Sequence, residues 1–162
     1  MEQKKKSAFL KVLFVLYVLG VLFILFFARV NRGDLYHWEL FSEEHLADRL
    51  QWIPFATIQR FFAKLNAQTI NLQFVVRNIA VNLLLFVPMG AMLPMLFPKR
   101  FGRFWKTILF IVLFVFILEI LQFLTFYGSA DVDDLIFNTF GAAVGYFLYY
   151  IGSKIKKSSS HS

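Results

Sequence analysis

The run TILFIVLFVFILEILQFLTFY, residues 107–127, decides the fold of this chain, because Glu119 is the one charged side chain within it. A helix of ~20 apolar residues crosses the ~30 Å hydrocarbon core of a bilayer. Three further runs have a similar length and few charges: residues 8–28, 74–97 and 135–152. The sequence therefore predicts an all-α membrane protein, a bundle of four transmembrane helices.

The composition supports a single membrane-embedded domain. The chain is 59% hydrophobic, contains 22 Phe and carries only 17% charged residues, which is less than a soluble domain of this size usually has. We expect one bundle over residues 1–157, an extracellular loop over residues 29–73, and a disordered tail over residues 158–162. The absence of cysteine excludes disulfides and thiolate metal sites.

The net charge of +7 reflects orientation signals rather than a nucleic-acid surface. Under the predicted topology, one side of the membrane has eleven basic residues in short segments, and the other side has six, spread over a longer loop. Short basic loops favour the cytoplasmic side. We therefore predict that both termini are cytoplasmic and expect no nucleic-acid partner. The eleven residues are Lys4, Lys5, Lys6, Lys11, Lys99, Arg100, Arg103, Lys106, Lys154, Lys156 and Lys157.

The loop over residues 29–73 contains a second kind of pattern. Ile58, Phe61, Phe62 and Leu65 follow a spacing of i, i+3, i+4, i+7, which predicts a short amphipathic helix. Such a helix would lie at the membrane interface, with Trp52 as an anchor, or would pack on the bundle. A further short helix is expected to begin at residues 42–44, Ser-Glu-Glu.

Polar side chains inside apolar runs are the candidate site, because charge in hydrocarbon costs ~2.5–3.5 kcal/mol at a helix centre. The predicted topology places polar residues of the second, third and fourth helices toward the outer side of the membrane. Their burial against one another is the least costly arrangement in lipid. The residues are Arg77, Asn78, Asn82, Glu119, Gln122, Asp131, Asp133, Asp134 and Asn138.

This set of residues suggests three kinds of chemistry. Four acids, Glu119, Asp131, Asp133 and Asp134, are candidate ligands of a divalent cation. Arg77 is a candidate partner for a phosphate or carboxylate. A close pair of carboxylates can also share a proton and act as acid and base. A pocket of this kind would suit an amphiphile, with its headgroup in the polar site and its tail between helices.

Purely structural roles are the alternatives for the same residues. An aspartate at the start of the fourth helix would cap it, and Glu119 would then be only a buried partner of Arg77. Asn78, Asn82, Gln122 and Asn138 would then bond between helices. Gly141 and Gly145 are predicted to allow close helix packing, and Pro88 with Gly90 to bend or break the second helix. The three histidines, His37, His45 and His161, lack metal-ligand spacing.

Four blocks of the sequence together form a pattern that resembles the VanZ-like family over about residues 51–152. The blocks are IPFATI at 53–58; Asn78 with NLLLFVPMG at 82–90; Glu119 with Gln122; and DVDDLIFNTFG at 131–141 with Gly145. Gln51 stands where many members have Asn, and residues 127–130 where many have an Arg. The resemblance implies a small, multi-spanning protein of the bacterial cytoplasmic membrane. It also implies a relation to a protein linked to resistance to the antibiotic teicoplanin.

The leading hypothesis is a membrane protein whose outward-facing polar pocket binds a cell-envelope amphiphile and modifies antibiotic susceptibility. In that role Arg77, Asn78, Asn82, Gln122, Asp131 and Asn138 would contact the ligand. The first alternative is an intramembrane enzyme acting on a phospholipid or polyprenyl phosphate, with Glu119, Asp133 and Asp134 as acid and base or as ligands of Mg²⁺ or Mn²⁺. A second alternative is a small transporter or a structural subunit.

Overall fold

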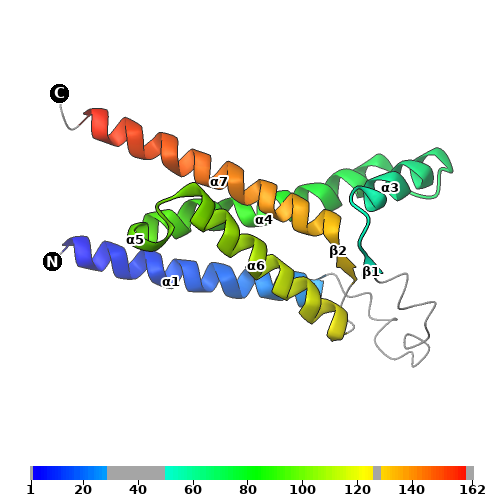
Figure 1. Ribbon diagram of the computed structural model, residues 1–162, viewed down its shortest axis with the longest axis horizontal. Helices are drawn as coiled ribbons and strands as arrows, with labels where there is room; N and C mark the ends of the chain where they lie inside the picture. Colours follow the sequence, from blue (N-terminus) through cyan, green and yellow to red (C-terminus); the bar gives the residue numbers. More distant parts are fainter. Residues whose placement is uncertain (1, 29–49, 126–128, 160–162) are drawn as a thin grey trace.

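The structure is a computed structural model that describes residues 2–28, 50–125 and 129–159. The elements follow one another as α1 (Glu2–Phe23), the π-helical turn η1 (Ile24–Ala28), β1 (Leu50–Gln51) and α3 (Ala56–Asn66). They continue as α4 (Leu72–Leu96), α5 (Pro98–Phe101), α6 (Phe104–Leu124), β2 (Ala130–Asp131) and α7 (Val132–Ser159). The fold is an all-α bundle (Figure 1).

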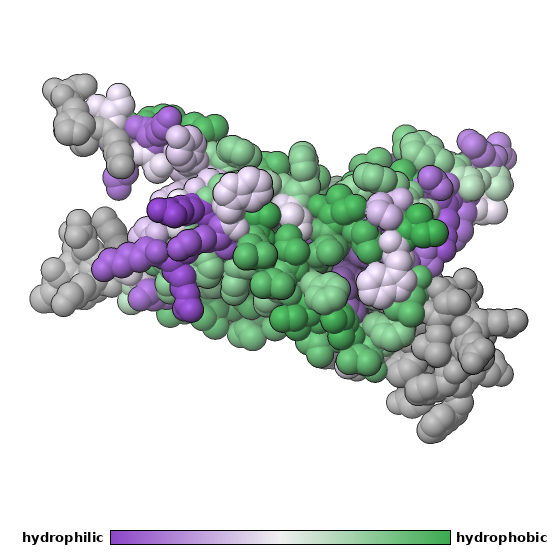
Figure 2. Space-filling model, in the orientation of Figure 1, coloured by the Kyte–Doolittle hydropathy of each residue, from purple (hydrophilic) through white to green (hydrophobic). Residues whose placement is uncertain are grey.

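Four helices of the described residues are long and apolar enough to cross a membrane, which confirms the predicted bundle. They cover Ser7–Phe26, Leu72–Leu96, Phe104–Leu124 and Val132–Lys156. The last helix continues to Ser159, so the first residues of the tail predicted to be disordered are helical. Figure 2 shows apolar side chains over the middle of one face and polar ones toward both ends, as expected for a protein surrounded by lipid.

The two ends of the bundle differ in what they carry. The N-terminus, the C-terminal end of α7 and α5 lie at one end, whereas β1, β2 and α3 lie at the other (Figure 1). The predicted topology also places both termini and the basic segment after the second span on one side.

The amphipathic helix predicted from Ile58, Phe61, Phe62 and Leu65 is α3. None of its residues is fully buried, and Phe62 is 63% exposed. It runs beside the beginning of α4, where the rings of Phe61 and Phe74 are in contact, and the pair extends beyond the other spans (Figure 1). Its apolar residues are therefore split between α4 and the surface. The helix predicted to begin at residues 42–44 lies outside the described residues.

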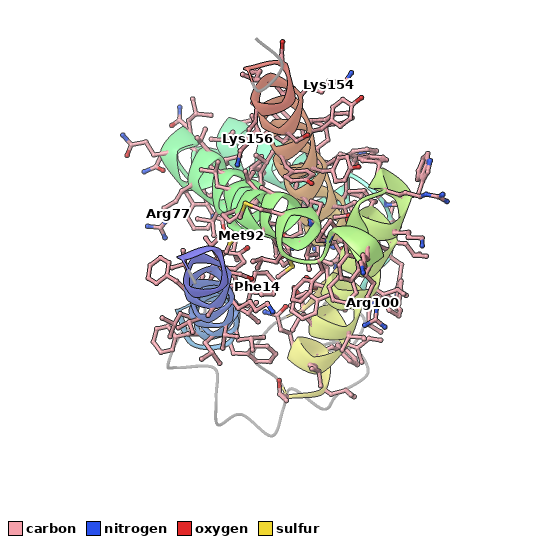
Figure 3. The ribbon with its side chains drawn as sticks, turned by 90° about the vertical axis from the view of Figure 1, so that its left-hand side faces the viewer. Phe14, Arg77, Met92, Arg100, Lys154 and Lys156 are labelled. Carbon is pink, nitrogen blue, oxygen red and sulfur yellow. The ribbon has the colours of Figure 1, made fainter. Side chains whose placement is uncertain are left out.

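The spans pack around α4, which contacts α1, α6 and α7 (Figure 3). Phe86 and Met89 of α4 are essentially inaccessible. Lipid is as apolar as these side chains, so the packed contacts and interhelical hydrogen bonds hold the helices together. One such bond runs from the Tyr17 hydroxyl of α1 to the carbonyl of Leu85 in α4. The core consists of Val21, Leu25, Phe86, Met89, Leu93, Ile111, Val115, Leu118 and Ala142.

Helices α4 and α7 make the closest backbone contact between spans, at three glycines. A Cβ atom on Gly141 would lie 1.9 Å from the Leu83 carbonyl oxygen, and one on Gly145 would lie 1.9 Å from that of Val87. Gly90 of α4 has the same relation to Ala142. The role of Gly141 and Gly145 in close packing is thus confirmed, and Gly90 adds a third contact from the opposite helix.

Of the predicted bend or break at Pro88 and Gly90, the break is wrong, because α4 is continuous from Leu72 to Leu96 with both Pro88 and Pro94 inside it, and the bend stays a prediction. A proline costs an interior helix one hydrogen bond, but neighbouring helices compensate for this in membrane proteins. Gly90 serves the contact with α7 instead.

Replacing Gly141 with alanine should destabilise the bundle by about 1–3 kcal/mol, because the added methyl group collides with a backbone carbonyl that cannot move alone. The measurement is thermal unfolding of the purified protein in a neutral detergent.

Gly152→Ala is the matched control, since Gly152 is in the same helix and a Cβ there meets nothing within 4 Å. Alanine at this position should leave stability unchanged or raise it. Equal melting curves for both variants would contradict the close α4–α7 contact.

Candidate functional site

The candidate site is centred on the N-terminus of α7, where the chain arrives from β2. The first N–H groups of a helix lack partners within the helix and carry a partial positive charge. The Asp131 carboxylate accepts a hydrogen bond of 2.8 Å from the Asp133 N–H and so caps α7. Its second oxygen accepts a bond of 2.6 Å from the Thr57 hydroxyl of α3.

Asp133 caps a different helix, α3. Its two carboxylate oxygens accept hydrogen bonds from the backbone N–H groups of Phe55 and Thr57, at the start of α3. Phe55 has a left-handed backbone with φ of 66°, which is unusual for a residue other than glycine. Two helix N-termini therefore meet over two carboxylates, and Asp133 is 1% exposed.

Asp134 turns toward α4, where its carboxylate accepts a hydrogen bond from the side-chain amide of Asn82. Asn82 is buried. Asn78, one turn earlier in α4, donates to the carbonyl of Phe74 in its own helix, at 2.8 Å. Asn78 and Asn82 are one turn apart and line the same pocket, but the two amides have different partners.

Glu119 and Gln122 bind backbone groups of other elements. The Glu119 carboxylate accepts a bond of 3.1 Å from the Asp131 N–H, in β2. The Gln122 amide donates a bond of 2.8 Å to the carbonyl of Leu25, in the π-helical turn that ends the first span. Asn138 is also buried, and its side-chain oxygen has no hydrogen-bond partner among the described residues.

Arg77 does not join this group. Its side chain is exposed and points outward from α4 (Figure 3). The sequence placed Arg77 near Glu119 and the aspartates by depth alone, and the rotation of α4 directs it elsewhere. The structure thus assembles the polar residues of α6 and α7 with Asn82 and leaves Arg77 outside.

A pocket of about 280 Å³ lies between α3, α4 and the start of α7. Asp131, Asp134, Asn78 and Asn82 give it a polar lining, and no basic residue lines it within the part of the chain that the structure describes. Glu119, Gln122, Asp133 and Asn138 are not among the lining residues. The remaining lining residues are Thr57, Phe61, Ile79, Ser129 and Phe137.

The four acids proposed as cation ligands are not arranged as a metal site. Among the described residues, no group of three or more His, Cys, Asp or Glu side chains could hold a metal ion. Each of the four carboxylates instead accepts a hydrogen bond from the chain: Asp131, Asp133 and Glu119 from backbone N–H groups, and Asp134 from Asn82. The expected capping of the fourth helix is performed by Asp131, whereas Asp133 caps α3 instead.

Sequence reasoning gave no role to two residues that complete this arrangement. Thr57 binds both Asp131 and Asp133, and Gln51 is buried where β1 pairs in parallel with β2, Gln51 opposite Asp131. Thr57 follows Pro54 at the start of the predicted amphipathic helix, so the sequence indicated that it lies at a helix N-terminus. A strand of two residues is too short to show an alternating pattern, so the sequence did not indicate the β1–β2 pairing.

Burial raises the pKa of the Asp131 carboxyl above its ordinary value. The hydrogen bonds from Thr57 and from the Asp133 N–H oppose this increase, and the nearby charges of Asp134 and Asp133 add to it. Asp131 therefore holds a proton at a higher pH than a solvated aspartate does.

Comparison with known proteins identifies the family. The model of the VanZ/LLP1 family matches residues 14–153, which is most of the chain. The chain belongs to the VanZ/LLP1 family. This confirms the resemblance seen in the four sequence blocks, and it extends the match toward both ends of the chain.

A curated relative gives a second, shorter match within the VanZ/LLP1 family. Protein VanZ of Enterococcus faecium is 33% identical over 78 residues, which are 48% of this chain and 47% of that protein. The chain thus matches about half the length of this curated relative. No solved structure matches the chain.

Replacing Asp133 with asparagine should loosen α3 in this VanZ/LLP1 protein, because an ionised cap is lost at the helix N-terminus. Caps contribute about 1–2 kcal/mol. Hydrogen exchange should therefore show roughly tenfold lower protection of the N–H groups of residues 55–60.

Asp134→Asn is the matched control for this experiment, since Asp134 is the next residue and binds Asn82 rather than α3. It should leave exchange in α3 unchanged. Equal loss of protection in both variants would show that Asp133 does not hold α3 specifically.

The raised pKa of Asp131 predicts a pH-dependent stability. The folded state holds the proton more tightly than the unfolded chain, so the stabilisation is complete below the ordinary value of 3.8 and is lost as the pH rises through the raised pKa. Asp131→Asn removes this titration. From about pH 4 to about pH 7, the melting temperature of the unaltered protein should fall relative to that of the variant. A constant or opposite difference would contradict the shift.

Proposed function

We propose that the pocket between α3, α4 and α7 binds the headgroup of a cell-envelope amphiphile, a glycopeptide antibiotic or a lipid-linked precursor, and that binding modifies glycopeptide susceptibility. One observation carries the proposal: polar and apolar side chains line the same pocket at one end of the bundle. Asp134 and Asn82 lie beside Phe61, Ile79 and Phe137. An amphiphile satisfies both kinds of surface.

The chemistry of the lining specifies the headgroup. Carboxylates and amide oxygens accept hydrogen bonds, and none of the described residues that line the pocket is basic. The headgroup should therefore offer donors, such as hydroxyl, amide or ammonium groups. This differs from the anionic group expected at Arg77, which lies outside the pocket. Asn78, Asn82, Asp131 and Asp134 are the proposed ligand contacts.

The proposed location is the bacterial cytoplasmic membrane, with both termini in the cytoplasm and the pocket facing outward. The basic residues Lys99, Arg100, Arg103 and Lys106 support this orientation, because they lie at the end of the bundle that carries the termini. The pocket is at the other end, beside α3. An envelope ligand would reach it without crossing the membrane.

Membership of the VanZ/LLP1 family supports the choice of ligand class, because the name-giving protein of the VanZ-like family is linked to teicoplanin resistance. Teicoplanin combines a peptide and sugar headgroup with a lipid tail. A polar pocket with an apolar border would suit such a molecule.

Asp134→Asn should weaken teicoplanin binding by about tenfold or more, because hydrogen bonds to an ionised acceptor contribute ~1.5–3 kcal/mol. The measurement is calorimetric titration of the protein in nanodiscs. The same substitution should lower the resistance that expression of the protein confers on a glycopeptide-susceptible host.

Gln73→Ala is the control, since Gln73 is exposed on α4 and does not line the pocket. It should bind teicoplanin like the unaltered protein. Undiminished binding by Asp134→Asn would end the proposal for this pocket. Equally tight binding of the deacylated antibiotic would show that the lipid tail is not recognised. If the unaltered protein converts a lipid-linked precursor into a product and Asp134→Asn abolishes that activity, the result would favour the alternative of an intramembrane enzyme.

A further inference from the structure

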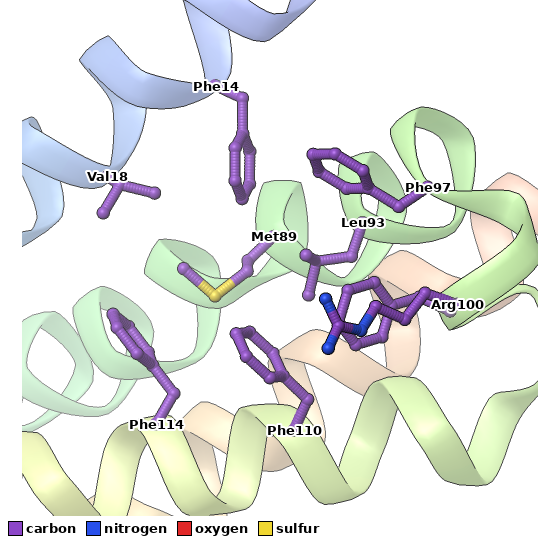
Figure 4. A pocket seen from close by; sticks show the side chains of 9 residues that line it. Phe14, Val18, Met89, Leu93, Phe97, Arg100, Phe110 and Phe114 are labelled. Atoms are coloured by element: carbon purple, nitrogen blue, oxygen red, sulfur yellow. The ribbon is translucent and has the colours of Figure 1, made fainter.

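A second cavity, of about 480 Å³, lies toward the end of the bundle that carries the termini, away from the polar pocket. Residues of α1, α4, α5 and α6 line it, and its lining side chains are drawn in Figure 4. Its volume is within the range of ~300–1,000 Å³ that is usual for sites of small ligands. Among the described residues, the lining is almost entirely apolar, and Arg100 is its one charged member.

Phenylalanine side chains form most of the wall. The rings of Phe97 and Phe101 lie 6.4 Å apart, those of Phe101 and Phe110 lie 4.9 Å apart, and those of Phe110 and Phe114 lie 6.2 Å apart. Phe14 of α1 contacts Phe97 from the other side, at 6.5 Å. Met89 completes the floor with a flexible side chain that adapts to an irregular guest. The wall matches a hydrocarbon chain.

Arg100 joins this apolar chamber to a basic surface. Figure 4 shows its guanidinium extending into the cavity between Leu93 and Phe110. The same residue lines a polar hollow of about 420 Å³ formed by α5, the following turn and the start of α6, together with Lys99, Arg103 and Lys106. Neither lining contains an acidic residue from the described ranges. A guanidinium binds phosphate through paired N–H donors.

We infer that this cavity is a binding site for an anionic membrane phospholipid. One acyl chain lies among the phenylalanines, and the phosphate pairs with Arg100 at the mouth, next to the basic side chains of α5. A neutral lipid fits the apolar part alone, and a free phosphate fits the basic part alone. Only a molecule with a hydrocarbon chain and an anionic group at one end satisfies both.

The site is independent of the proposed pocket for envelope amphiphiles. The two cavities share no lining residue, and they lie toward opposite ends of the bundle. The carboxylates of the polar pocket favour a ligand that offers hydrogen-bond donors, whereas Arg100 in this cavity selects an anion. A bound phospholipid here would also fill the space between α1 and the other spans.

The test is lipid selection from nanodiscs that contain equal amounts of phosphatidylglycerol and phosphatidylcholine. The full chain is transferred to a neutral detergent, and retained lipid is counted by native mass spectrometry. We expect phosphatidylglycerol to be enriched about tenfold. Arg100→Gln should remove most of this enrichment. Lys106→Gln, the control at the basic hollow outside the apolar cavity, should change it less than about twofold.

Equal losses in Arg100→Gln and Lys106→Gln would overturn the site, because they would show a general attraction between the basic segment and anionic lipid. Val18→Phe adds a larger side chain to the lining of the apolar cavity without a change in charge. It should lower retention of phosphatidylglycerol, because less space remains for the acyl chain. Unchanged retention in that variant would also overturn the inference.

A label on the unaltered protein tests the site even if a variant fails to fold. Phosphatidylglycerol with a photoreactive group in its acyl chain should form adducts mainly at residues 89–114, which supply most of the lining. Adducts scattered over the lipid-facing sides of all four spans would contradict a defined site.

Discussion

The structure depends on one constraint: backbone N–H and C=O groups at helix ends and irregularities need partners where water is scarce. Asp131 caps α7, Asp133 caps α3, and Glu119 accepts the N–H of Asp131. Gln122 donates to a carbonyl in the π-helical turn after α1. Buried side chains with charge or amide groups thus tie α1, α3, α6 and α7 together through backbone groups rather than through ion pairs with one another.

This constraint separates two sets of residues that look alike in the sequence. Glu119, Asp133 and Gln122 lie in the interior and bind the chain itself. Asp134 and Asn82 also bind each other, but they border the polar pocket between α3, α4 and α7, whereas the pocket that Glu119 borders is smaller, about 100 Å³, and mostly apolar. An acid inside a membrane span is therefore insufficient as a sign of chemistry. Its hydrogen-bond partners and its access to a cavity decide whether a ligand can reach it.

The four spans and α3 were predictable because length, hydropathy and helical periodicity are local properties of the sequence. The close packing at Gly141 and Gly145 was predictable for the same reason. The position of Arg77 was not, because depth along a helix does not determine the direction of a side chain around it. The contacts of Thr57 with Asp131 and Asp133 join segments more than 70 residues apart, and no local pattern encodes such a pairing.

The glycine contacts between α4 and α7 also act as an alignment device. At Gly90, Gly141 and Gly145, a backbone carbonyl of the facing helix lies so close that a Cβ atom would collide with it. If either helix moved along its axis by one residue, or rotated by the same step, a side chain would replace a glycine at the contact and collide with a peptide group. The glycines therefore fix the register of the two helices. That register keeps Asn82 opposite Asp134. Glycines in the apolar interior thus determine how Asn82 and Asp134 meet at the first turn of α7.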